Sequence, residues 1–142
     1  MKGYSSDLYI LAFDHRGTLT KGLLGVEGRA PSGDEVARVS SMKDIIFDGF
    51  LEARNQGIEG GDPAILVDEA FGIQVQERAK EMGIKFAAPV EKSGQKVFDF
   101  EYGDDFGEKI KEVNADFVKI LVRWNPDDDT DTRQIQGERI KT

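Results

Sequence analysis

The chain has 142 residues, the length of one ordinary domain, and its 39% hydrophobic and 32% charged residues are typical of globular proteins. The net charge of −8 argues against a nucleic-acid partner, whose phosphates need a basic surface. With no cysteine and one histidine, the chain excludes disulfides, thiol catalysis and zinc sites built on several histidines. It contains no apolar run of about 18 residues and no signal-peptide pattern, so we predict a cytoplasmic chain without a membrane span.

Short apolar runs alternate with helical patterns along the chain. The first run, residues 8–13, predicts a strand, and the glycine-rich stretch 17–33 after it is predicted to be an irregular loop. Ser32 and its neighbours carry the signals of a helix start. The helix that follows has apolar residues at spacings of three and four, namely Val39, Met42, Ile46, Phe50 and Ala53.

The rest of the chain repeats this alternation. Further strands are predicted at residues 64–67, 85–90 and 117–122, a second long loop at 93–103, and a last helix from about Thr130. Two helices between these strands show apolar stripes, the first made of Val75, Ala79 and Met82 and the second of Phe106, Ile110 and Val113.

Each predicted strand ends in a charged cluster. Parallel strands present their carboxyl ends at one rim, which is where (β/α)₈ barrels carry their active sites. A complete barrel needs about 250 residues, so the chain is long enough for only the first four βα units. We therefore predict one α/β domain over residues 1–142, a half barrel with parallel strand order 1-2-3-4. The clusters are Asp14-His15-Arg16, Asp68-Glu69, Glu91-Lys92 and Arg123-Trp124-Asn125.

Side-chain parity places Lys119 and Arg123 on the same face of the fourth strand. A lysine inside a strand is costly unless it reaches a polar interior or a partner. Two readings follow for Lys119. It is a neutral amine beside Arg123, able to form an iminium with a carbonyl substrate, or it pairs with Asp14 or Glu91 inside the barrel.

The strand ends AFDHRG, LVDEAFG, PVEKSGQ with FDFEYGDDF, and FVKILVRWNP resemble a bacterial domain family. Members of that family are fused C-terminal to the sugar kinase 5-dehydro-2-deoxygluconokinase, and they are similar to class I tagatose-bisphosphate aldolases, which are (β/α)₈ barrels. The resemblance implies an aldolase-like lyase for a phosphorylated keto-sugar in myo-inositol catabolism. It also implies that the Schiff-base lysine, on strand six of the aldolases, lies outside this half of the barrel.

The resemblance gives catalytic roles to Asp14, near the reacting carbons, to Lys119 and to Glu91. Together with the rim chemistry it suggests a set of substrate-binding residues, in which arginine would grip phosphate with both of its terminal nitrogens. The open alternatives are that Asp14, Asp68 and Glu91 hold Mg²⁺, or that they only cap helices and pair with neighbouring cations. We expect no organic cofactor. The substrate-binding set is Arg16, Asp68, Lys92 and Arg123.

An isolated half barrel leaves its first and last strands as bare apolar edges, which invite pairing. We therefore expect a homo-oligomer or association with the C-terminal half of a barrel. The alternative to a lyase is a non-catalytic half barrel or partner domain that associates with a kinase module or a second half barrel.

Overall fold

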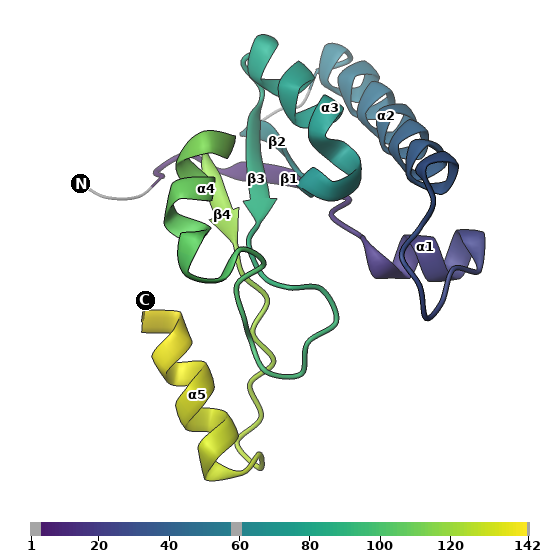
Figure 1. The fold of residues 1–142 in the computed structure, drawn as a ribbon. Coiled ribbons are helices and arrows are strands. Elements are labelled where there is room, and N and C mark those ends of the chain that lie inside the picture. Colours follow the sequence, from purple (N-terminus) through teal and green to yellow (C-terminus); the bar gives the residue numbers. More distant parts are fainter. Residues whose placement is uncertain (1–3, 58–60, 142) are drawn as a thin grey trace.

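The computed structural model of the chain describes residues 4–57 and 61–141. Its strands form one parallel sheet in the order β1-β2-β3-β4, as predicted for an α/β fold (Figure 1). Helices connect the strands, and the carboxyl ends of the strands therefore meet at one edge. The strands are β1 (Leu8–Ala12), β2 (Asp62–Leu66), β3 (Lys85–Pro89) and β4 (Phe117–Lys119).

The helices follow the predicted alternation, with one addition. They are α1 (Gly17–Leu24), α2 (Gly33–Asn55), α3 (Glu69–Glu81), α4 (Phe106–Val113) and α5 (Thr130–Lys141), with a short 3₁₀ turn η1 (Gly103–Asp105) before α4. None of the helices within the described ranges is long and apolar enough to cross a membrane.

Helix α1 corrects the prediction of an irregular loop over residues 17–33. The glycines in this stretch suggested a loop, but two of them stand at the ends of the helix. Gly17 opens it, and Gly25 closes it in the left-handed conformation (φ 65°) that favours glycine. Only Gly22 lies inside, and the turn after the helix buries Val26.

Helix α2 begins where Ser32 predicted, with a capping box. The Ser32 hydroxyl accepts from the Glu35 backbone N–H, and the Glu35 carboxylate accepts from the Ser32 backbone N–H. Its buried stripe matches the predicted one at Val39 and Phe50 but not at Met42 and Ile46. Ile46 is 38% exposed, and Met42 is only partly buried. The residues that face the core are Val39, Lys43, Phe47 and Phe50.

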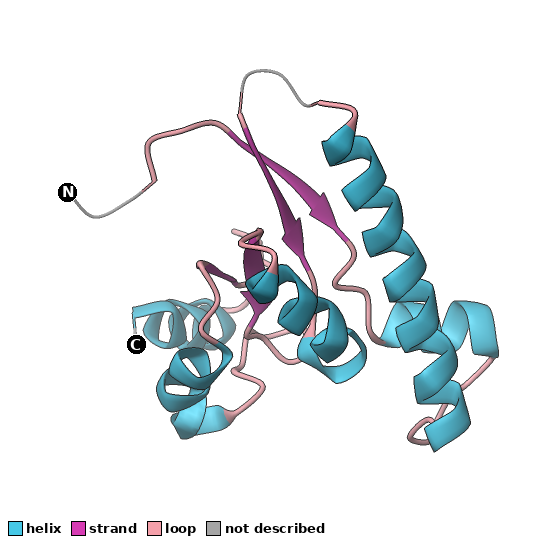
Figure 2. Cartoon of the chain, turned by 90° about the horizontal axis from the view of Figure 1, so that it is seen from above, coloured by secondary structure: helices cyan, strands magenta, loops and turns pink. Residues whose placement is uncertain are grey.

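The hydrophobic core lies between the sheet and the two helices α2 and α3. Phe47 and Phe50 of α2 and Val75 of α3 pack against Ile65 of β2 and Phe86 of β3. Figure 2 shows α2 running alongside the strands. The register pairs Ile65 with Phe86, so both side chains point to this helical face.

The charged residues at the strand ends belong to the opposite face of the sheet. Ala12 pairs with Leu66, Leu66 with Ala87, and Pro89 with Lys119, so these residues share the second face. Asp14 and Glu91 lie two residues beyond Ala12 and Pro89, respectively, where the same alternation directs them to the side of Lys119.

Strand β4 is shorter than the predicted 117–122. After β3 the chain turns away, and Glu91 forms an antiparallel bridge with Phe100 of the following loop instead of continuing beside residues 120–122. Ile120 and Leu121 therefore lack a strand partner and are exposed. The outer strand at the other edge, β1, is likewise bare, with Tyr9 48% and Leu11 42% exposed.

Candidate active site at the strand ends

Three predicted catalytic residues meet at the rim. The Lys119 ammonium donates to Asp14 Oδ2 at 2.9 Å and to Glu91 Oε1 at 2.8 Å. The three side chains come from the ends of β1, β3 and β4, so the parallel sheet brings together residues up to 105 positions apart. The predicted pairing of Lys119 with Asp14 or Glu91 thus occurs with both carboxylates at once.

Lys119 is held as an ammonium. Burial alone would lower its pKa, but the hydrogen bonds to Glu91 and Asp14 and their negative charges outweigh this, so the pKa is raised above 10.5. The structure therefore favours the ion-pair reading over the neutral amine. A charged lysine does not attack a carbonyl, whereas it can donate a proton or stabilise a developing negative charge.

Arg16 fixes Glu91 from the other side. One terminal nitrogen donates to the Glu91 carbonyl at 2.8 Å and to Glu91 Oε1 at 3.3 Å, and the other reaches Glu101 at 3.2 Å. Among the described residues, no donor satisfies the second carboxylate oxygen, Glu91 Oε2, although this atom is buried. Glu91 is thus a rigidly held carboxylate with one oxygen left for a further donor.

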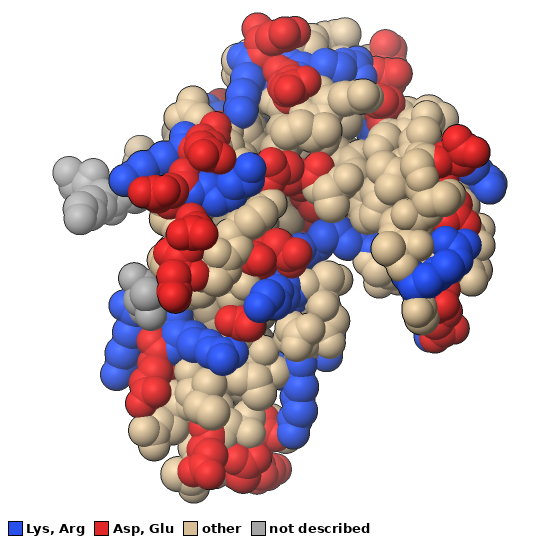
Figure 3. All heavy atoms as spheres, in the orientation of Figure 1, with Lys and Arg blue, Asp and Glu red and all other residues tan. Residues whose placement is uncertain are grey.

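A cleft of about 700 Å³ opens over these residues, a size suited to a small ligand. In Figure 3 the surface is hollowed between the part that carries α1 and the part that ends in α5. Although the chain is acidic overall, cations outnumber carboxylates in the lining. The carboxylates are Asp14 and Glu91, and the cations are Arg16, Lys21, Lys92, Lys119 and Arg123.

Of two predicted binding residues in this cleft, Lys92 has a side-chain partner and Arg123 has none among the described residues. Lys92 donates to Asp99 at 2.8 Å. The Arg123 side chain makes no hydrogen bond or ion pair with any described residue, while its backbone carbonyl accepts from Gln136 of α5 at 2.8 Å. Helix α5 thus fixes the Arg123 backbone and leaves the guanidinium free for an anion.

Asp68 lies apart from this group. Its side chain is 1% exposed, one oxygen pairs with Lys43, and the other accepts from the backbone N–H of Phe71 at 2.9 Å, capping α3. Asp68 lines a smaller pocket of about 170 Å³ behind Arg16 rather than the large cleft. The structure therefore brings together Asp14 and Glu91 but not all three predicted acids.

No group of three or more His, Asp or Glu side chains within residues 4–57 and 61–141 is arranged to hold a metal ion. Lys119 also stands between Asp14 and Glu91, where a divalent cation would otherwise bridge them. The residues at the rim therefore fit Mg²⁺ poorly.

Lys43 is the residue that sequence reasoning missed. It is fully buried on α2, and its ammonium contacts both Asp68 and the end of β1. The signal was present in the spacing, because Val39, Lys43 and Phe47 follow one another at intervals of four. The predicted stripe used Met42 and Ile46 instead and did not include the lysine.

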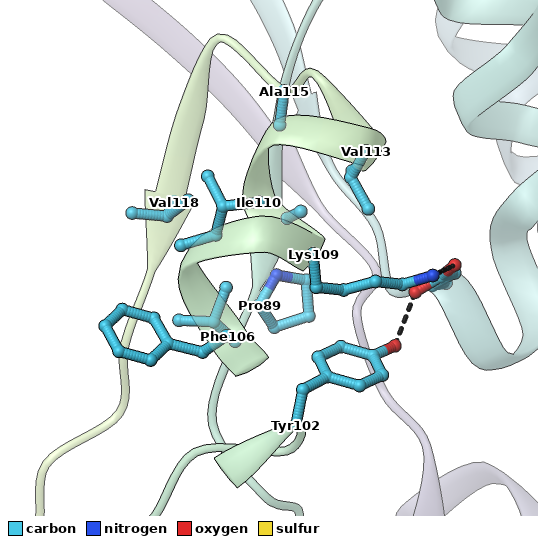
Figure 4. A pocket seen from close by; sticks show the side chains of 11 residues that line it. Pro89, Tyr102, Phe106, Lys109, Ile110, Val113, Ala115 and Val118 are labelled. Atoms are coloured by element: carbon cyan, nitrogen blue, oxygen red, sulfur yellow. Dashed lines mark hydrogen bonds and ion pairs between the residues drawn. The ribbon is translucent and has the colours of Figure 1, made fainter. Parts of the chain in front are cut away.

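A second pocket, shown in Figure 4, has the wrong size for a substrate. It lies between α4 and the ends of β3 and β4, with Phe106, Ile110 and Pro89 in its wall. Its volume of about 20 Å³ has room for one water molecule. At its edge, Tyr102 donates to Glu69, which ties the long loop to α3.

Comparison with protein families gives one match, which covers residues 1–142. The matched family is DUF2090, described as "uncharacterized protein conserved in bacteria". The chain belongs to the DUF2090 family. No curated protein and no solved structure matches the chain significantly. The rim cluster and the cationic cleft of this DUF2090 chain thus carry the functional argument.

Proposed function

We propose that the chain is an aldolase-like lyase domain acting on a phosphorylated keto-sugar in myo-inositol catabolism. The observation that carries the proposal is the Asp14–Lys119–Glu91 cluster facing a cation-rich cleft. Support also comes from the four strand-end motifs, which resemble the domain family fused to 5-dehydro-2-deoxygluconokinase and, through it, the class I tagatose-bisphosphate aldolases. In this proposal the sheet is the first half of a (β/α)₈ barrel.

The reaction breaks the bond between the carbons α and β to the ketone. The proton of the β-hydroxyl passes to a carboxylate, a role for Glu91, which lines the cleft. The aldehyde leaves, and the bonding electrons remain on the α-carbon. Lys119 stabilises the negative charge that develops and donates the proton that the α-carbon finally takes up. The proton that Glu91 took from the β-hydroxyl then passes to the Lys119 amine along their hydrogen bond, which restores both groups.

The electron sink of this chemistry comes from elsewhere in the proposed barrel. Class I cleavage needs a neutral amine to form an iminium, and Lys119 is held charged. The resemblance places that amine on strand six, so the complementary half barrel supplies it. This chain contributes the proton-transfer cluster and the anion-binding wall.

Phosphate binding tests the proposal on the chain itself. We expect saturable binding of dihydroxyacetone phosphate by calorimetry, weakened at least tenfold in Arg123→Gln, because this free guanidinium can grip a phosphate. The matched control is Arg54→Gln, which removes an exposed arginine outside the cleft lining. If the wild type does not bind, or if both variants lose affinity equally, the cleft is not the phosphate site.

The exposed edges of the sheet favour a second candidate, a non-catalytic half barrel that works through association. Ile10 on β1 is 46% exposed and Val118 on β4 is 48% exposed, so each edge offers apolar side chains and unpaired backbone. Two copies placed edge to edge would pair β4 of each with β1 of the other and close eight parallel strands. A kinase module is the other partner for such a domain. The lyase candidate predicts phosphate-ester binding and the association candidate does not. Calorimetry with dihydroxyacetone phosphate therefore distinguishes the two candidates.

A further inference from the structure

Lys43 is a fully buried cation whose three ammonium hydrogens are all used. It donates to the Phe13 carbonyl at 2.7 Å, to the His15 carbonyl at 3.0 Å and to the Asp68 carboxylate. It thereby joins α2, the start of α3 and the segment that follows β1. The two carbonyls that it binds stand on either side of Asp14.

Placing a charged lysine at this core position costs desolvation free energy. Burial lowers the pKa of Lys43, while the negative charge of Asp68 opposes that shift. A buried ion pair contributes little net stability compared with well-packed apolar side chains. Lys43 therefore adds something that an apolar residue at the same place would not, namely two bonds to the backbone around Asp14.

Neighbouring residues pack around this contact. A Cβ atom at position 72 would overlap Val67 and lie in ordinary contact with Cδ of Lys43, at 3.6 Å, so α3 packs closely against both residues here. Phe13, on one side of Asp14, is buried and anchored in the core, whereas the His15 side chain, on the other side, is exposed. The bond from Lys43 to the His15 carbonyl thus holds the less anchored side.

We propose that Lys43 is a positioning residue, which holds the backbone on both sides of Asp14 so that the Asp14 carboxylate reaches Lys119. Asp14 Oδ2 contacts Lys119 across the sheet from the first strand end to the fourth, and that contact depends on where the backbone after β1 points. The inference deepens the proposed function, because Asp14 and Lys119 belong to the proposed proton-transfer cluster.

The test measures the protonation of Lys119 rather than turnover. The pKa of the Lys119 ammonium is followed by NMR on lysine-labelled protein, in the wild type and in Asp14→Asn, which lacks the carboxylate charge. We expect Lys43→Met to lower the pKa of Lys119 to the Asp14→Asn value, because the displaced carboxylate no longer stabilises the ammonium. Lys111→Met, which removes an exposed lysine, should leave it unchanged.

Lys43→Met leaves Asp68 as an unpaired buried charge, so the double variant Lys43→Met/Asp68→Asn is the decisive one. Asparagine can still cap α3, and no buried charge remains. If this variant, folded by circular dichroism, keeps the wild-type pKa of Lys119, the proposal is overturned. A second measurement needs no substitution: in the wild type the Lys43 ammonium should show nuclear Overhauser contacts to Asp14 and His15, and their absence also overturns it.

These outcomes are independent of the lyase proposal. A protein without affinity for phosphate esters would remove the proposed activity but would leave the effect of Lys43 on Lys119 intact. Conversely, a lyase in which Lys43→Met leaves the pKa of Lys119 unchanged would keep its activity assignment and lose only this inference.

Discussion

At the scale of single residues, Lys119 determines what the rim can do, because it neutralises two carboxylates. In Lys119→Met these carboxylates lose their shared cation, and we expect the unfolding free energy at pH 7 to fall by about 1–3 kcal/mol. The lower end applies because Lys119 is 30% exposed and water screens its charge. Urea denaturation against the Lys111→Met control measures the difference.

The pH dependence of that difference follows from the direction of the Lys119 shift. Its pKa is raised in the folded state, so its stabilising contribution is complete below the unfolded value of 10.5 and is lost as pH rises through the folded pKa. The gap between wild type and Lys119→Met should thus be constant from pH 7 to 9 and shrink above pH 10.5. A gap that shrinks between pH 7 and 9 would mean that Lys119 titrates low, as the neutral-amine reading requires.

Gly72 is the residue at which packing leaves no room for a side chain. In Gly72→Ala the new methyl group would overlap Val67, so we expect the unfolding free energy to fall by about 1–3 kcal/mol in thermal or urea unfolding. The matched control is Gly49→Ala on α2, where nothing lies within 4 Å of the added methyl group. That change should stabilise the protein by about 0.5–1 kcal/mol, because alanine is the better helix former. Equal effects of the two substitutions would contradict the packing argument.

At the scale of elements, α2 begins with an electrostatic cap. Arg29 donates to both oxygens of Glu35 at 2.8 Å, and Glu35 accepts from the Ser32 backbone N–H. These hydrogen bonds lower the pKa of Glu35 to about 2, and those from Arg29 have the largest effect. A lowered carboxyl pKa gives stability that is present above the unfolded value of 4.5 and is lost as pH falls toward 2.

Glu35→Gln should therefore unfold more easily than the wild type at pH 7, and the two should converge as pH falls from 4.5 to 2. The control is Glu77→Gln, which removes an exposed carboxylate on α3 for which the structure shows no ion pair. The measurement is thermal unfolding of the wild type and both variants at several pH values. A difference that is independent of pH in this range would show that the charge of Glu35 does not support the cap.

Local patterns predicted the elements that depend on neighbours in sequence. The apolar runs gave four parallel strands in the right order, and Ser32 gave the start of α2. Of two errors, the first was a local ambiguity and the second came from a contact between separate segments. Glycines at the ends of α1 resembled those of a loop, and β4 stopped at Lys119 because Glu91 bridges Phe100 instead.

The same distinction holds for the site. Strand alternation and the common rim of the strand ends were enough to bring Asp14, Glu91 and Lys119 together, since both follow from the strand pattern alone. Asp68 and Lys43 could not be placed in this way. Their pairing depends on how α2 is rotated against α3. The amphipathic pattern predicted this rotation wrongly, because it turned Met42 and Ile46 to the core in place of Lys43 and Phe47. The protonation of Lys119 also depends on two carboxylates that come from distant parts of the chain.

At the scale of the whole molecule, the two edge strands β1 and β4 are the surfaces where association is expected. Both strands lie at edges of the described sheet and expose apolar side chains, which a stable half barrel would bury against further strands. If a second copy provides them, light scattering should give twice the 15.8 kDa mass of the chain. Ile10→Asp places a charge on β1 and should shift the population to single chains, because that carboxylate would be buried in the closed barrel.

Ile45→Asp is the matched control, since Ile45 is 70% exposed on α2 and lies on neither edge strand. It introduces the same charge and removes the same side chain, so it should leave the mass unchanged. Circular dichroism must show that both variants are folded. A wild type that scatters as a single chain at every concentration would rule out pairing of copies. In the proposed barrel, the completing strands would then come from a different half barrel, the arrangement that would supply the strand-six amine of the proposed lyase.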